Sequence, residues 1–148
     1  MSVHNVVEEL NDSPASAINF GGALTSKSSS SGVGYSTGAG GSVTQGAGSG
    51  RATAVTVNAV CGAIVTDDAS LAAEASAEFV VTNSAVSNTD TVVVSERSGS
   101  NGGNTIVHVT GVALGSFNIS VTNNNVAAGT AETGAIIINF VVIKSVTV

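Results

Sequence analysis

The residue types that could support chemistry are few in this chain, and they are scattered. Two glycine-rich segments, at residues 38–41 and 46–48, invite comparison with phosphate-binding loops. Neither completes the G-x-G-x-x-G pattern, because Val43 and Arg51 stand where the third glycine is required. The Walker pattern fails as well, because Ala47 occupies the position of its lysine. We therefore expect no phosphate-binding loop.

The titratable side chains suggest no local site either. Asp67 and Asp68 could contribute to a calcium site, but no D-x-D-x-D-G loop surrounds them, and a solvated turn is the expectation. His4 and His108 are the two histidines. His108 alternates with apolar neighbours in a strand-like run, so we expect it to face solvent or a neighbouring subunit.

Nucleophile and modification motifs are equally weak. Cys61 is the single cysteine, which excludes an internal disulfide framework and a multi-cysteine zinc site, and we expect it to be a small buried apolar residue. No G-x-S-x-G motif marks a catalytic serine. The sequon that begins at Asn118 lies inside a predicted strand, so glycosylation is not expected. We expect no enzymatic activity, no catalytic or metal-binding residues and no cofactor.

Composition points to assembly with other subunits. Only 9% of the residues are charged, against about 25% in typical domains. The surface must then consist of Ser, Thr, Asn and Ala, which other subunits can cover. A net charge of −6 with four scattered basic residues argues against nucleic-acid binding. The first ten residues lack the features of a signal peptide, so we expect synthesis in the cytoplasm, and no apolar run reaches the ~20 residues of a membrane span.

The apolar segment near the C-terminus, residues 134–148, is expected to organise the fold. Between residues 135 and 143 only Asn139 is not apolar, and the β-branched content favours a strand. A strand this apolar is expected to be central, with both faces covered. Ile138, Phe140 and Val142 would lie on one face, and Ile137, Val141 and Ile143 on the other.

Residues 51–148 are predicted to form a two-sheet antiparallel β-sandwich. Period-two alternation and turn residues mark seven or eight short strands, with Phe79, Phe117, Ile119, Ile138 and Phe140 in the core. The other predicted strands are residues 53–58, 62–66, 78–83, 91–96, 106–110 and 116–123. Residues 71–77 could hold one helical turn. A jelly-roll topology is preferred, but the pattern does not separate it from an immunoglobulin-like one.

Residues 1–50 are predicted to be an extended, Gly- and Ser-rich N-terminal arm. Val3, Val6, Val7 and Leu10 would share one face of a short helix. Such a helix is marginal in water, and the glycines beyond it disfavour a packed element. The alternatives are a disordered leader and an arm that orders only against a partner.

Several segments resemble a family of small virion proteins of tailed bacteriophages. They are GYSTGAGGSVTQ (residues 34–45), VTVNAVCGAI, FVVTNSAVSNTDTVVVS, IVHVTGVALGSFNISVTN and the closing INFVVIKSVT. The resemblance spans residues 34–146. It implies a β-sandwich structural protein, found as a head protein or as a module at the end of a fibre-like protein, and it implies no catalytic residues.

Two functions follow from the resemblance as expectations. The first is a decoration (cement) protein that sits on the virion's outer capsid surface as a homotrimer and contacts the major capsid protein. The alternative is a tail-fibre or receptor-binding tip module. The short chain and the scarcity of aromatic residues favour decoration. The predicted partner-contact residues are the apolar side chains of the arm: Val3, Val6, Val7, Leu10, Ile18, Phe20 and Tyr35.

Overall fold

The computed structural model describes residues 27–30, 32–35, 38–126 and 129–145. The chain divides into two units, Met1–Gly34 and Tyr35–Val148, and the strands described below belong to the second unit. The predicted helix face at Val3, Val6, Val7 and Leu10 lies outside the described residues, as do Ile18 and Phe20.

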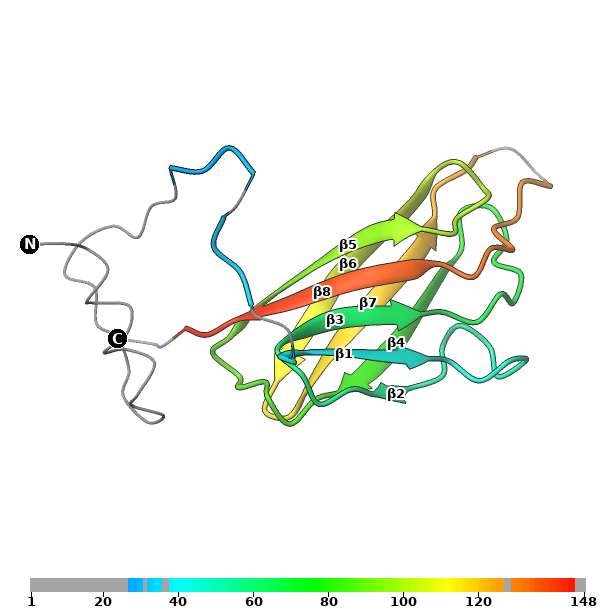
Figure 1. Cartoon of the computed structure of the whole chain (residues 1–148). Coiled ribbons are helices and arrows are strands. Elements are labelled where there is room, and N and C mark those ends of the chain that lie inside the picture. Colours follow the sequence, from blue (N-terminus) through cyan, green and yellow to red (C-terminus); the bar gives the residue numbers. More distant parts are fainter. Residues whose placement is uncertain (1–26, 31, 36–37, 127–128, 146–148) are drawn as a thin grey trace, which may run out of the picture. The chain divides into compact units, whose positions relative to one another are not determined.

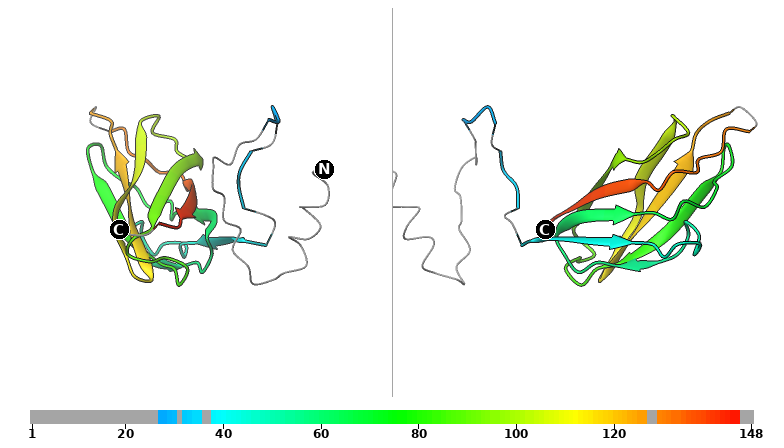
Figure 2. Two further views of the ribbon diagram at one scale, coloured as in Figure 1. Left: turned by 90° about the vertical axis from the view of Figure 1, so that its left-hand side faces the viewer. Right: turned by 45° about the vertical axis from the view of Figure 1, so that its right-hand side comes forward.

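The described residues form an all-β sandwich of two four-stranded sheets, which confirms the predicted fold class (Figure 1). One sheet has the order β1-β3-β8-β5, and the other has the order β2-β4-β7-β6. Figure 2 shows the two sheets as separate layers. The strands are β1 (Gly40–Thr44), β2 (Val55–Thr56), β3 (Cys61–Val65), β4 (Ser76–Thr82), β5 (Thr91–Ser98), β6 (Thr105–Ala113), β7 (Ser116–Asn123) and β8 (Ile137–Ile143).

Two edge strands join their sheets in parallel, which differs from the antiparallel sandwich that we predicted. β1 pairs in parallel with β3, and β2 pairs in parallel with β4. Parallel neighbours need a crossover connection. Here the chain leaves β1, contributes β2 to the opposite sheet and returns as β3. These pairings do not establish the preferred jelly roll, which is an all-antiparallel architecture.

The sandwich begins before the predicted boundary at Arg51. Gly40 to Thr44 form ladder pairs with Cys61 to Val65, so β1 is part of the sheet rather than of an arm. Two glycines permit this pairing. A Cβ on Gly62 would lie 1.9 Å from the carbonyl oxygen of Gly41, and one on Gly41 would lie 2.9 Å from Val57. Gly62 therefore allows the backbones of β1 and β3 to approach closely, and Gly41 leaves room for the Val57 side chain.

The core forms between the sheets from alternate strand residues, as predicted. Phe79, Phe117, Ile119, Ile138 and Phe140 are all buried. The rings of Phe117 and Phe140 lie 5.7 Å apart, and they join β7 of one sheet to β8 of the other.

β8 is central, between β3 and β5, as predicted from its apolar sequence. The expectation that both of its faces are covered is wrong for the single chain. Ile138, Phe140 and Val142 are buried, whereas Ile143 on the outward face is 51% exposed. The second sheet covers only one side of the first, and nothing in the described part of the second unit buries Ile143.

The predicted helical turn at residues 71–77 is also wrong. Leu71 forms an isolated bridge with Glu132, and β4 starts at Ser76. The Leu71 side chain packs into the core, so tertiary contact determines the local conformation here.

Candidate functional site

A cluster of buried polar side chains occupies one end of the sandwich, and Arg51 is at its centre. The guanidinium of Arg51 is almost fully buried and donates four hydrogen bonds. Its acceptors are the carbonyl oxygens of Ala69, Glu132 and Gly134 and the hydroxyl of Thr66, at 2.6–3.3 Å. Burial lowers the pKa of Arg51, while attraction to Glu132 and to two aspartates opposes that shift. The planar guanidinium therefore ties together segments that are far apart in sequence.

Gln45, the residue after β1, forms the second part of the cluster. Its amide nitrogen donates to the carbonyl oxygens of Arg51 and Thr53, at 3.0 and 2.6 Å. Its side-chain oxygen accepts from the backbone N–H of Asp67, at 2.8 Å. The buried side chain thus connects the end of β1 to the loop before β2 and to the loop after β3.

Glu132 is the third member, and its side chain is fully buried. Its carboxylate accepts hydrogen bonds from the backbone N–H groups of Asn101, Gly102 and Gly134 and from the hydroxyl of Thr105, at 2.7–3.1 Å. Burial raises the pKa of Glu132, but these hydrogen bonds outweigh burial and lower it to about 2. The carboxylate is therefore ionised and joins its own loop, between β7 and β8, to the β5–β6 loop and the start of β6.

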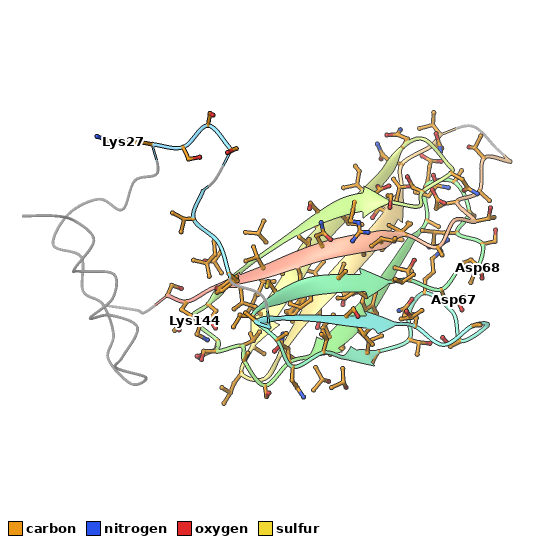
Figure 3. The ribbon with its side chains drawn as sticks, in the orientation of Figure 1. Lys27, Asp67, Asp68 and Lys144 are labelled. Carbon is orange, nitrogen blue, oxygen red and sulfur yellow. The ribbon has the colours of Figure 1, made fainter. Side chains whose placement is uncertain are left out.

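Asp67 lies beside this cluster, and it is buried rather than solvated as we had expected. Its Oδ1 accepts from the N–H of Ala69 at 2.8 Å, whereas Oδ2 has no hydrogen-bond partner in the described part of the chain. Asp68 is exposed, as predicted for a turn. Figure 3 shows the two aspartates at one end of the sandwich and Lys144 at the other end.

A pocket of about 180 Å³ adjoins Asp67. It is lined by Thr44, Gln45, Ala47, Val65, Thr66, Asp67, Asp68 and Ala135. Over residues 27–30, 32–35, 38–126 and 129–145, no three His, Cys, Asp or Glu side chains gather as a metal site would require. Asp67 and Asp68 therefore have no third acidic, histidine or cysteine partner for the calcium site considered above.

The remaining sequence candidates do not converge. His108 is exposed on β6, as the alternation predicted, and Cys61 is only partly buried on the outward face of β3. Asn118 lies on β7, and its side chain donates to Glu78. His4 lies outside the described residues. The glycines at 40 and 41 belong to β1, which is a paired strand rather than a phosphate loop.

Tyr35 is the one predicted partner-contact residue that the structure describes. Its side chain is 45% exposed, and its hydroxyl donates to the carbonyl oxygen of Val142 on β8. This bond attaches Tyr35, which precedes β1 in the chain, to the central strand. Among the described residues, no helix is long and apolar enough to span a membrane.

The sequence patterns did not predict the cluster of Gln45, Arg51 and Glu132. The position of Arg51 was the one sequence feature that could have indicated it. Charged residues are uncommon in this chain, and Arg51 stands between a glycine-rich stretch and a strand. The partners of Arg51 lie up to 83 positions away, and no local pattern reveals them. The hydrogen-bonding atoms of these three side chains are largely paired with the chain's own backbone. The cluster therefore resembles a structural element that fixes loops more than a reaction centre.

No protein-family model, curated protein or solved structure matches this chain.

Proposed function

We propose that this chain is a structural protein of a tailed-bacteriophage virion. It decorates the outer capsid shell as a homotrimer, contacts the major capsid protein and stabilises the shell as a cement protein. The resemblance of residues 34–146 to small virion proteins supplies the phage context. The structure supports the structural part of the role, because the resembling segments form a sandwich with little charge.

The observation that carries the proposal is how the buried polar groups are used. Arg51, Gln45 and Glu132 are buried polar side chains at one end of the sandwich, and their hydrogen bonds go to the chain's own loops, whereas Oδ2 of the buried Asp67 has no partner in the described part of the chain. A catalytic or ligand-binding group needs donors or acceptors left over for a substrate. Side chains committed to their own backbone instead rigidify a scaffold, which is what a shell-stabilising protein needs.

Attachment to the capsid is assigned to the N-terminal arm, with Val3, Val6, Val7, Leu10, Ile18, Phe20 and Tyr35 as the contact residues. Because the compact unit begins at Tyr35, Tyr35 would be a contact at the boundary, and the other six residues precede that unit. Three arms in a trimer would increase a weak contact by avidity.

The test is the abundance and location of the protein in purified virions. We expect copy numbers comparable to those of the major capsid protein, and density on the outer shell in a particle reconstruction. A low copy number with density at the tail tip would favour the fibre module and overturn the decoration role.

Attachment by the arm has its own test. Particles lacking the protein would be incubated with the full chain and with a chain that starts at Tyr35. We expect only the full chain to bind. Equal binding by both chains would place attachment in the sandwich.

A further inference from the structure

The carboxylate of Asp67 ends in a buried oxygen atom that lacks a hydrogen-bond partner. The residue is only 3% exposed, and its Oδ1 accepts from the N–H of Ala69 at 2.8 Å. Its Oδ2 has no partner in the described part of the chain. A charged acceptor buried in this way costs free energy, because it has lost water and has gained no donor in exchange. Such a group needs a donor from elsewhere.

The Asp67 side chain lies on the side of the sheet that lines the pocket. The backbone beyond β3 keeps the alternation of an extended strand, because the N–H of Thr66 donates toward β8 and the N–H of Asp67 donates toward Gln45 at the end of β1. Side chains two residues apart in such a segment share a face. Asp67 therefore lies on the same face as Val65, and both line the pocket of about 180 Å³.

The charges around this pocket leave a negative excess. Arg51 is attracted to three carboxylates, those of Glu132, Asp67 and Asp68, so three formal negative charges surround one positive charge. The hydrogen bonds of Arg51 go to other acceptors. In the described part of the second unit, the other basic residues do not donate to Oδ2 either. The missing partner is therefore a cation that the sandwich does not supply.

We propose that the pocket beside Asp67 binds a lysine side chain of a partner protein. Ala47, Val65 and Ala135 supply apolar walls along which the methylene chain of a lysine can pack. The ammonium group then donates to Oδ2 of Asp67, close to the exposed carboxylate of Asp68. The site goes beyond the proposed function, because it does not depend on whether the partner is a capsid protein.

The geometry fits a lysine better than a metal ion or an arginine. Calcium takes about six to eight oxygen ligands, and Asp67 and Asp68 are the acidic side chains that line the pocket. The positive charge of Arg51 nearby also opposes a divalent ion. An arginine forms a bidentate pair with both oxygens of a carboxylate, whereas Oδ1 of Asp67 is already used. One free oxygen suits the point charge of an ammonium group.

The test is a titration of the isotope-labelled full chain with Nα-acetyl-lysine N-methylamide, followed by NMR. We expect the N–H signals of Asp67 and Ala69 to shift with a Kd in the millimolar range. The Nε-acetylated form of the same compound is the matched control ligand, because it keeps the methylene chain and loses the charge. It should bind about tenfold more weakly or not at all.

Two substitutions in the pocket locate the binding site. Asp67→Asn should weaken binding about tenfold or more, because the charge-assisted hydrogen bond is lost. It keeps an oxygen for the N–H of Ala69, and circular dichroism verifies its fold. Ala47→Leu narrows the pocket without changing the carboxylates, and a similar loss is expected. Glu78→Gln is the control, since it removes an exposed carboxylate on the other sheet and should leave binding unchanged.

The outcomes separate this site from its alternatives. Equal binding of the Nε-acetylated compound, full binding by Asp67→Asn, or no shift with either compound would overturn the proposal. Shifts with calcium chloride but not with the lysine compound would make the pocket a metal site, which also overturns it. Tighter binding by Lys27→Gln than by the wild type would mean that the chain's own lysine competes for the pocket, and it would overturn the partner as the source. None of these results bears on capsid decoration, which the copy number in virions tests separately.

Discussion

At the scale of single residues, the ionised carboxylate of Glu132 illustrates how burial and hydrogen bonding compete. Removal of water destabilises the charge, but four donors converge on two oxygens and reverse the effect on the pKa. Such charge-assisted hydrogen bonds are roughly twice as strong as neutral ones. The loops that supply the donors are therefore held by a single side chain.

Glu132→Gln should destabilise the fold by about 2–3 kcal/mol, because an amide presents N–H groups to donors that need an acceptor. Chemical denaturation at neutral pH measures this loss. Glu78→Gln is the control, since Glu78 is exposed and accepts a hydrogen bond from the side chain of Asn118. Equal effects of the two substitutions would contradict the role given to Glu132.

The pH dependence follows from the same carboxylate. Its pKa in the folded state, about 2, lies below the ordinary value of 4.5. The ionised form therefore stabilises the fold fully above pH 4.5, and this contribution is lost as the pH falls toward 2. The loss is about 3 kcal/mol, and it should be absent from the stability profile of Glu132→Gln. If the stability of the wild type and of Glu132→Gln fell equally as the pH was lowered, Glu132 would not be the source of the acid dependence.

Arg51→Met should cost about 3–5 kcal/mol, because it removes four hydrogen bonds, including the donors to the carbonyl oxygens of Ala69 and Gly134, and removes the positive charge near Glu132 and Asp67. Arg97→Met is the matched control on the surface, where a change within about 0.5 kcal/mol is expected. Urea unfolding of both variants measures these changes in the free energy of unfolding. A loss below about 1 kcal/mol for Arg51→Met would mean that the loops relax onto other partners.

At the scale of elements, β1 shows how a glycine-rich stretch becomes a strand. Five of its residues pair with β3, and a bond from the N–H of Gln45 to the carbonyl oxygen of Val65 extends the pairing. The sequence offers little side-chain packing in this strand. Its stability comes from the ladder, from Gln45 beyond its end and from Tyr35 before its start.

Gly62→Ala should release β1 from the sheet, because the new Cβ would lie 1.9 Å from the carbonyl oxygen of Gly41. Overpacking of this kind costs about 1–3 kcal/mol. We expect faster hydrogen exchange at β1 amides such as Val43, with β8 still protected. Gly40→Ala is the control, since its Cβ would meet only ordinary contacts at 3.7–3.8 Å. Unchanged β1 exchange in Gly62→Ala would show that the strands can separate slightly at little cost.

At the scale of the whole molecule, the position of the domain boundary decides which truncated chains keep the complete β-sandwich. The compact unit starts at Tyr35, whereas the sequence pattern had placed the boundary after Gly50. A chain cut at Arg51 lacks β1 and Gln45. It therefore loses the β1–β3 ladder and the partner of the Asp67 N–H.

A chain that starts at Tyr35 should unfold within a few degrees of the full chain, whereas one that starts at Arg51 should lose about 3 kcal/mol or more. Calorimetry of the two truncations compares them directly. Similar stability of both would mean that β1 contributes little, and the boundary inferred from composition would then be adequate.

The sequence by itself determined the core and every strand except β1. Residues such as Phe79, Phe117 and Ile138 were assigned correctly, because the side chains of a strand alternate between faces and this alternation is a local property. The central place of β8 followed in the same way from its apolar residues. The predicted jelly roll and the attaching arm stay predictions.

Only the tertiary structure decided which distant segments meet. Arg51 and Gly134 lie 83 positions apart, and their hydrogen bond exists because two loops reach the same end of the sandwich. β1 is a strand because β3 accepts it, although its own composition suggests a flexible segment. Likewise, the apolar sequence of β8 indicated two covered faces, but whether Ile143 is covered depends on what lies outside the sheet. The local sequence carries the alternation of apolar residues and the strand propensity. Which distant residues meet, and which strand faces are covered, are properties of the folded chain as a whole.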